Sequence, residues 1–225
     1  MPVIVVTDSS ARLSPDELAA RNIRQVPLHV LVDDQDLRDG IDEVPYDIHD
    51  RPKVSTAGAA PAELADAYRQ ALADSGGDGV VAVHLSAALS STYSSAVAAA
   101  REFGPAVRVV NSRSAAMGVG FVARLAADAA ASGADLDTVE AQARSATERT
   151  HAFIVVHTLE NLRRSGRIGV AASWLGTALA LKPLLTLDVD GRLVLDQRIR
   201  TVGKAHAAMI ERVVALIGDK GARWA

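Results

Sequence analysis

The sequence predicts an α/β protein, with a parallel-sheet amino-terminal domain flanked by helices and a smaller α+β second domain containing a β-hairpin. Three observations predict this fold class. Short apolar runs alternate with segments of helical periodicity, small polar residues directly follow the runs, and the pattern changes to a hairpin in the last third. We expect the two domains to span residues 1–150 and 151–225.

The first elements are two strands and a long connection. The apolar run "VIVV" before "TDSS" predicts a buried strand. "IRQVPLHVLV" predicts a second strand, which Pro27 would place at a sheet edge or at a bulge. Residues 34–60 are acidic and irregular, and a connection of that length is expected to be functional.

Helices and strands then alternate as far as residue 148. Helical periodicity between Pro61 and "SGGDG" predicts a helix over residues 61–74. The later patterns predict strands over 80–85 and 107–110 and helices over 91–103, 115–131 and 136–148. This order implies parallel strands joined by right-handed crossovers.

The last third of the chain has a different pattern. "HAFIVV" predicts a strand, which is followed by a polar, basic loop and a helix from Ser173 to about Lys182. "LLTLDVDGRLVLDQRIR" predicts a hairpin around Asp190-Gly191, a favoured two-residue turn. A final amphipathic helix is expected over residues 204–217.

Composition narrows the classes of function. The chain has 225 residues, is 49% hydrophobic, carries a net charge of −3 and has no cysteine. An acidic chain with only 4% aromatic residues is not expected to bind nucleic acid. No apolar stretch reaches the roughly 20 residues that span a bilayer, so membrane contact is expected to be transient at most. Without disulfides or a leader-like start, we expect a cytoplasmic protein.

A run of hydroxyl residues lies where one helix is expected to begin. "HLSAALSSTYSSAVAAA", residues 84–100, follows a run of valines and leads into an alanine-rich helical pattern. With Ser90 as the helix cap, the amides of the next three residues have no partner within the helix. These amides, the helix dipole and the hydroxyl groups of Ser90, Ser91 and Thr92 would form a seat for an anion. The alternative is a cap with exposed serines.

Other polar groups are expected at the same edge of the sheet. "VSTAGAAPAEL" puts Thr56 ahead of a helix start, and "TDSS" and "NSRSAAMGVG" repeat the order of strand end, small polar residues and helix start. Because parallel strands end at one edge, these groups would converge. Arg163, Arg164 and Arg167 suit a carboxylate or phosphate, or they form a solvated basic loop.

Signatures of common enzyme classes are absent from the sequence. The six histidines lack metal-binding spacing, and there is no P-loop, dinucleotide glycine fingerprint or G-x-S-x-G elbow. We therefore expect no metal. One catalytic alternative stays open, in which Ser90 is the nucleophile of an acyl hydrolase or phosphotransferase and His84 or His157 is its base.

Eight short motifs occur in a distinctive order along the chain. They are "VTDSS", "VPLHV", "RDG", "ST" at residues 55–56, "LSSTY", "NS" with "MGVG", "TLENLRRSGRI" and "LALKPLL". Over nearly its whole length, the chain therefore resembles the DegV family. The resemblance implies a two-domain α/β protein that binds a long-chain fatty acid, such as palmitate, and needs no other cofactor.

The resemblance also implies a role and a set of site residues. Many members are the non-catalytic, acyl-binding subunit of a bacterial fatty acid kinase, presenting the carboxylate to an ATP-binding partner for phosphorylation and use in phospholipid metabolism. The family's carboxylate-binding threonine, serine and arginine fall on Thr56, Ser90 and Arg167. Candidates to line the acyl tail are Trp174, Leu175, Leu179 and Leu181, although each is also compatible with an ordinary core position.

The chain departs from the family pattern at several positions. Ser91 replaces a glycine, Ala57 lacks a second hydroxyl group, and Leu37 stands where tyrosine is common. Family members continue beyond the position of Ala225 to a histidine before "GPG", so a second domain that is short relative to the family is expected. These departures leave a third reading open, that of a degenerate relative that binds no ligand.

Overall fold

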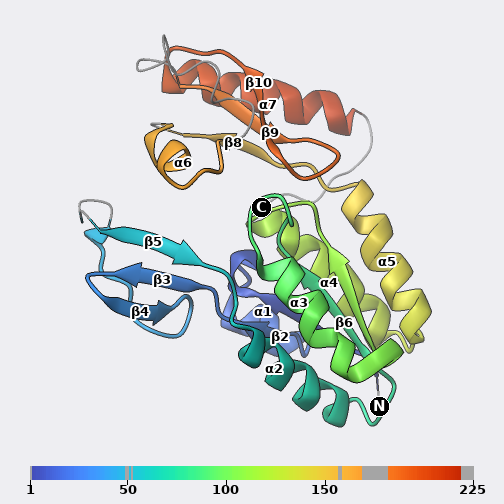
Figure 1. Ribbon diagram of the computed structural model, residues 1–225. Helices are drawn as coiled ribbons and strands as arrows, with labels where there is room; N and C mark the ends of the chain where they lie inside the picture. Colours follow the sequence, from blue (N-terminus) through green and yellow to red (C-terminus); the bar gives the residue numbers. More distant parts are fainter. Residues whose placement is uncertain (1, 49–50, 52, 157–158, 169–181, 219–225) are drawn as a thin grey trace. The chain divides into compact units, whose positions relative to one another are not determined.

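The computed structural model describes residues 2–48, 51, 53–156, 159–168 and 182–218. The chain forms two compact units, Met1–Thr150 and His151–Ala225. Figure 1 labels most of their helices and strands, and each unit is described by itself.

A four-stranded parallel sheet forms the centre of the first unit (Figure 1). Its strands, in spatial order, are β2 (Arg24–Val26), β1 (Ile4–Asp8), β6 (Val80–His84) and β7 (Val107–Asn111). Every neighbouring pair is parallel. All residues of β1 and β6 are buried, which is why each strand begins with a continuous apolar run. The predicted parallel sheet is confirmed.

Helices cover both faces of this sheet. Successive strand residues point to opposite sides, so the apolar strands present buried side chains to helices on each side. Val5, Val81 and Val83 pack against α4 (Met117–Ala131) and α5 (Leu136–Glu148). Ile4, Val80 and Ala82 pack against α2 (Pro61–Asp74) and α3 (Thr92–Ala100). The short helices are η1 (Ser9–Ala11), α1 (Pro15–Ala20) and η3 (Arg101–Ala106). The helix predicted over 91–103 thus changes to a 3₁₀ turn after Ala100.

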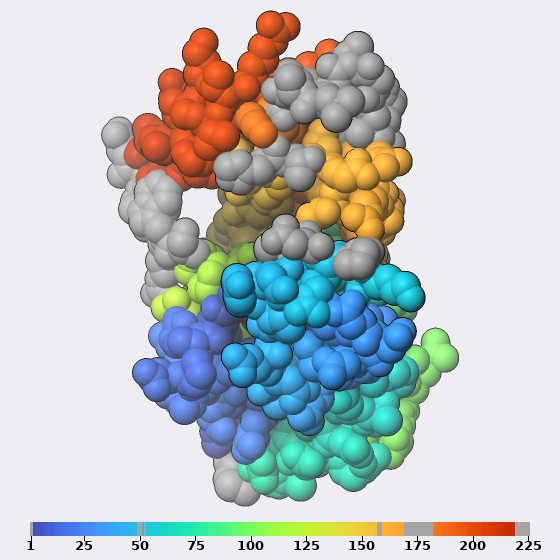
Figure 2. Space-filling model, turned by 90° about the vertical axis from the view of Figure 1, so that its left-hand side faces the viewer, coloured from blue at the N-terminus to red at the C-terminus, as the bar shows by residue number. Residues whose placement is uncertain are grey.

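The first unit also contains an antiparallel sheet that the sequence did not predict. Its order is β4 (Gln35–Arg38), β3 (His29–Val32) and β5 (Val54–Ala57). The expected single strand around Pro27 is wrong, because its two halves join different sheets. The expectation of irregular structure over 34–60 is also wrong for β4 and β5. In Figure 2 this sheet, blue to cyan, lies at the surface.

The second unit is built on an antiparallel sheet of three strands. In spatial order these are β10 (Leu193–Gln197), β9 (Leu184–Leu187) and β8 (Phe153–Val155). The predicted hairpin is confirmed, but its predicted two-residue turn is wrong. The amide of Asp188 donates to the carbonyl of Arg192 at 3.0 Å, which leaves residues 189–191 as a three-residue loop. The remaining described helices of this unit are α6 (Glu160–Arg164) and α7 (Val202–Ile217).

Several sequence predictions concern the remaining residues of the second unit. The helix expected from Ser173 to about Lys182 lies outside the described residues, apart from its last residue. In the part of the chain that the structure describes, no helix has the length and apolarity needed to cross a membrane.

Candidate functional site

The carboxyl ends of three neighbouring strands carry polar residues at one edge of the parallel sheet. β1 ends at Asp8, β6 at His84 and β7 at Asn111, and the last two pair directly in register. Beyond the strands, the amide of Ser112 donates to the carbonyl of His84 at 3.0 Å. The amide of Ser86 donates to the carbonyl of Ser114 at 2.8 Å. The segments that follow the strands are therefore tied to one another.

A buried chain of hydrogen bonds lies beneath these segments. Asp8, His84 and Tyr68 are each fully buried. Asp8 Oδ2 lies 3.0 Å from His84 Nδ1 and accepts from the amide of Leu85 at 3.0 Å. The Tyr68 hydroxyl lies 2.8 Å from His84 Nε2. The other Asp8 oxygen accepts from the amide and the hydroxyl of Ser10. Every polar atom of the three side chains thus has a partner.

This arrangement keeps Asp8 ionised. Burial alone would raise the pKa of Asp8, but the hydrogen bond and charge of His84, with donors from Ser10 and Leu85, hold that pKa below its ordinary value. Burial, followed by the nearby charge of Asp8, raises the pKa of Tyr68, so its hydroxyl stays protonated. Both ring nitrogens of His84 are occupied, which leaves His84 no nitrogen to act as a base for Ser90. The other candidate base, His157, lies outside the described residues.

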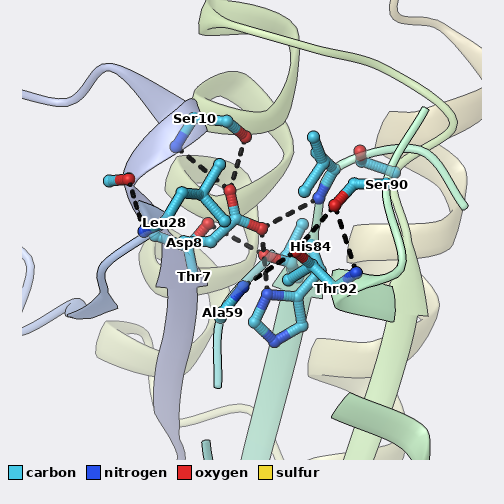
Figure 3. A network of polar contacts seen from close by, with 12 residues as sticks. Thr7, Asp8, Ser10, Leu28, Ala59, His84, Ser90 and Thr92 are labelled. Carbon is cyan, nitrogen blue, oxygen red and sulfur yellow. Dashed lines mark hydrogen bonds and ion pairs between the residues drawn. The ribbon is translucent and has the colours of Figure 1, made fainter. Parts of the chain in front are cut away.

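The hydroxyl-rich loop continues from β6 to α3 and folds on its own polar groups. The amides of Leu89 and Ser90 both donate to the carbonyl of Ser86, at 2.9 and 3.1 Å. Ser90 Oγ lies 2.9 Å from Thr92 Oγ1 and accepts from the amide of Thr92 at 3.2 Å. Figure 3 shows this group beside the Asp8–His84 contact. Hydrogen bonds among its own residues thus hold the loop in place.

The expected helix cap needs a correction. The residue before the first turn of α3 is Ser91, with no side-chain capping bond, and Ser90 instead bonds the amide of Thr92. The first helical hydrogen bond runs from the amide of Ser95 to the carbonyl of Ser91 at 2.9 Å. The helix therefore supplies no acceptor for the amides of Tyr93 and Ser94.

The segment that carries Thr56 reaches this loop. Thr56 is an exposed residue of β5, and the chain leaves the strand through Gly58 and Ala59. The amide of Ala59 donates to Thr92 Oγ1 at 3.2 Å. A Cβ atom placed on Gly58 would lie 2.7 Å from Thr92 Oγ1 and 3.1 Å from Ser91 Oγ. Only glycine permits this close approach, so the two segments predicted to form the seat are in contact.

The predicted site residues differ in their exposure. Thr56 and Ser91 are exposed, Ser90 is half-buried and Thr92 is fully buried. Arg167 belongs to the second unit, where it is half-buried in the turn after α6 and donates from Nη1 to the carbonyl of Ser165 at 2.7 Å. The predicted tail-lining residues lie outside the described residues; they are Trp174, Leu175, Leu179 and Leu181.

Two of the sequence motifs meet at Asp39. Ser9 Oγ donates to Asp39 at 2.8 Å and accepts from the amide of Leu28 at 3.0 Å. Arg12 forms an ion pair with Asp39 at 3.2 Å. "VTDSS" and "RDG" are therefore connected in space, and Asp39 and Asp8 are supporting residues that sequence reasoning did not single out. The signal available in the sequence was that both residues lie within the motifs that carry the family resemblance.

A shallow depression of about 440 Å³ lies elsewhere in the first unit. It is lined by residues 31–36 and 53–55, including Asp33, Asp34 and Asp36. Neither the Ser90 loop nor Gly58 contributes to it, and its carboxylates do not suit the acyl chain that the sequence resemblance implies. Among the described residues, no cluster of three or more histidine and acidic side chains could hold a metal ion.

Comparisons with known proteins identify the family. The protein-family model described as "Uncharacterised protein, DegV family" matches residues 2–223 of the chain. A DegV domain-containing protein of Mycobacterium tuberculosis strain H37Rv is 62% identical over 225 residues, which is 100% of this chain and 80% of the relative.

Solved structures agree with this match. A DegV family protein from Thermus thermophilus, described as binding fatty acid, has a TM-score of 0.89 at 35% identity, over 97% of this chain and 79% of that one. DegV from Bacillus subtilis, described as a fatty acid binding protein, has a TM-score of 0.84 at 28% identity, over 96% and 78%. The chain belongs to the DegV family.

Proposed function

We propose that this protein binds a long-chain fatty acid and seats its carboxylate where the Thr56 segment meets the Ser90 loop. The observation that carries the proposal is the contact of Gly58 and Ala59 with Thr92, which brings two hydroxyl-bearing segments to one helix start. A carboxylate there would accept from hydroxyl groups and from the amides at the start of α3, and the helix dipole favours negative charge.

The seat residues have different roles in this proposal. Thr56, Ser90 and Ser91 are exposed or half-buried and can reach a ligand. Thr92 is buried and bonded to Ala59 and Ser90, so we assign it to holding the seat together. The fatty-acid-binding structures from T. thermophilus and B. subtilis, at 35% and 28% identity, support the class of ligand.

Affinity is proposed to come from the tail and orientation from the head group. Each buried methylene contributes about 0.8 kcal/mol, so a long chain supplies most of the binding free energy. We propose Trp174, Leu175 and Leu179 as tail contacts, on the resemblance to the family alone. Arg167 is proposed, on the same ground, as a further donor to the carboxylate.

The ligand is identified by extracting the purified protein with organic solvent and analysing the extract by mass spectrometry. We expect a stoichiometric long-chain fatty acid, and a protein that is empty after expression and after incubation with palmitate contradicts the proposal. Thr56→Ala and Ser90→Ala should each weaken palmitate binding by about 1–3 kcal/mol through lost charge-assisted hydrogen bonds. Ser132→Ala, which removes a hydroxyl at the end of α4, serves as the control and should bind normally.

We further propose that the protein is non-catalytic and cytoplasmic and presents the acid to a separate ATP-binding fatty acid kinase subunit. The occupied ring nitrogens of His84 support a non-catalytic role, because they leave Ser90 without this base. The absence of cysteine fits a reducing compartment. We expect acyl phosphate only when protein, kinase subunit and ATP are combined. Acyl-ester hydrolysis by the protein alone that is lost in Ser90→Ala would contradict this role.

A further inference from the structure

His29 lies between two carboxylates that come from different elements. On β3, its Nδ1 is 2.7 Å from Asp36 Oδ1 of β4. Its Nε2 is 2.9 Å from Glu63 Oε2 in the first turn of α2. The side chain is only 12% exposed. The ring is therefore a direct link between the antiparallel sheet and a helix that packs on the parallel sheet.

This geometry requires a charged imidazole. A carboxylate only accepts hydrogen bonds, so both ring nitrogens must carry a proton to satisfy Asp36 and Glu63 together. Burial alone would lower the pKa of His29, but the hydrogen bonds and charges of Glu63 and Asp36 outweigh it and raise that pKa above 6.5.

The other charges near His29 are already paired. Arg38 is the residue opposite His29 in the β3–β4 register. Its guanidinium donates to both oxygens of Asp42 at 2.9 Å, and its amide donates to Asp42 at 2.8 Å. The strand on the other side, β5, places the uncharged Ala57 opposite His29. Asp36 and Glu63 are thus the carboxylates that respond most directly to protonation of this ring.

The link lies one step from the proposed seat. Ala57 pairs with His29; Thr56 precedes Ala57 in β5, and Gly58 follows Ala57 directly after the strand ends. Gly58 and Ala59 contact the Ser91–Thr92 segment. Movement of β3 relative to α2 would therefore move Thr56 relative to Ser90.

We propose that His29 is a positioning residue: its imidazolium, held by Asp36 and Glu63, fixes β3 against α2, and with it the paired strand that carries Thr56, so that protonation of His29 sets the geometry of the carboxylate seat. The statement about the seat rests on the proposed function, whereas the link itself does not. As long as both carboxylates are ionised, the link is complete below pH 6.5, and it is lost as the pH rises through the raised pKa of His29.

The link is tested first on the protein without ligand, by NMR between about pH 5.5 and about pH 9. We expect His29 to titrate above 6.5 and the amide signals of Thr56 and Ala57 to shift with the same midpoint. Glu63→Gln should lower that midpoint. In His29→Gln the pH-dependent shifts should vanish, whereas His206→Gln, at an exposed histidine of α7, should retain them. A His29 midpoint at or below 6.5, or Thr56 signals indifferent to it, overturns the link.

The effect on the seat is tested by measuring palmitate affinity over the same pH range. We expect the wild type to lose affinity by about fivefold as His29 deprotonates, within the usual range for coupled sites. His29→Gln should bind weakly at all pH values, and its pH dependence should be flatter than that of His206→Gln. Identical pH profiles for the two variants overturn the effect on the seat. If palmitate does not bind at any pH, the proposed function fails. The NMR titration without ligand still shows whether His29 forms the link to Asp36 and Glu63.

Discussion

The two sheets of the first unit are stabilised by different interactions. In the parallel sheet, every residue of β1 and β6 is buried and helices pack on both faces. In the antiparallel sheet, Val32 is the only buried residue of β3, β4 and β5. Ion pairs connect that sheet instead, including those of His29 with Asp36 and Glu63.

The difference indicates how the proposed seat is held. The Ser90 loop follows β6 of the buried parallel sheet, whereas Thr56 belongs to the exposed antiparallel sheet. The loop and the segment after Thr56 are in contact at Gly58 and Thr92. Burial of apolar area does not depend on pH, but ion pairs do. Near neutral pH, the half of the proposed seat on the parallel sheet should therefore change little with pH, whereas the half on the antiparallel sheet should respond to the charge of His29.

The largest difference in the free energy of unfolding is expected between two leucine-to-alanine changes, one beside the parallel sheet and one in the antiparallel sheet. Leu64 of α2 is fully buried against the parallel sheet, so Leu64→Ala should lower the free energy of unfolding by about 2–5 kcal/mol. Leu31 of β3 is 36% exposed, and Leu31→Ala should cost less than about 1 kcal/mol. Urea denaturation measures both, and equal losses would contradict the division.

A second large effect is expected from the buried carboxylate. Asp8→Asn leaves the charge and donors around it unmatched and should cost about 3 kcal/mol at neutral pH. Because the pKa of Asp8 is lowered, its stabilisation is present above its ordinary value of 3.8 and is lost as the pH falls through the lowered pKa. The difference between Asp8→Asn and wild type should shrink there. Asp66→Asn, at an exposed ion pair with Arg69, is the control and should change little.

A change at the junction should affect binding more than folding. Gly58→Ala places a Cβ 2.7 Å from Thr92 Oγ1, which forces the seat apart. We expect palmitate affinity to fall by about tenfold, in line with the usual cost of overpacking. Gly203→Ala in α7 meets no atom within 4 Å and should bind as the wild type does. Unchanged affinity in a folded Gly58→Ala protein would remove this junction from the site.

The smallest effect is expected at the exposed end of the antiparallel sheet. The hydrogen bonds from Arg38 hold the pKa of Asp42 at about 2. Arg38→Gln should return that pKa toward 3.8, as measured by carboxyl NMR, with little change in stability because the pair is solvent-exposed. A pKa that stays near 2 would show that another group governs Asp42.

The sequence was sufficient to predict the parallel sheet of the first unit but not its antiparallel sheet. Buried parallel strands contain continuous apolar runs, so "VIVV" and the valine-rich run over residues 80–83 identified β1 and β6. β4 and β5 are four residues long and mostly polar, and β5 pairs with β3 across a long intervening segment. No local pattern records such a pairing.

The candidate site was predictable in part for a similar reason. Spacing located the Ser90 loop at a strand-to-helix junction, which the structure contains. It did not predict that Ser90 bonds the amide of Thr92 and leaves the cap position to Ser91. The Asp8–His84–Tyr68 chain joins three elements and depends on the register of β1 and β6, which residue types alone do not fix.

The central claim is that a carboxylate is recognised at the junction of the two sheets. It is tested most directly by comparing the dissociation constants of palmitate and its methyl ester for the wild type and for Ser90→Ala. We expect the ester to bind the wild type about tenfold more weakly than the acid, as one lost charge-assisted interaction implies. The difference should largely disappear in Ser90→Ala. Equal affinities of acid and ester for the wild type would contradict a carboxylate seat.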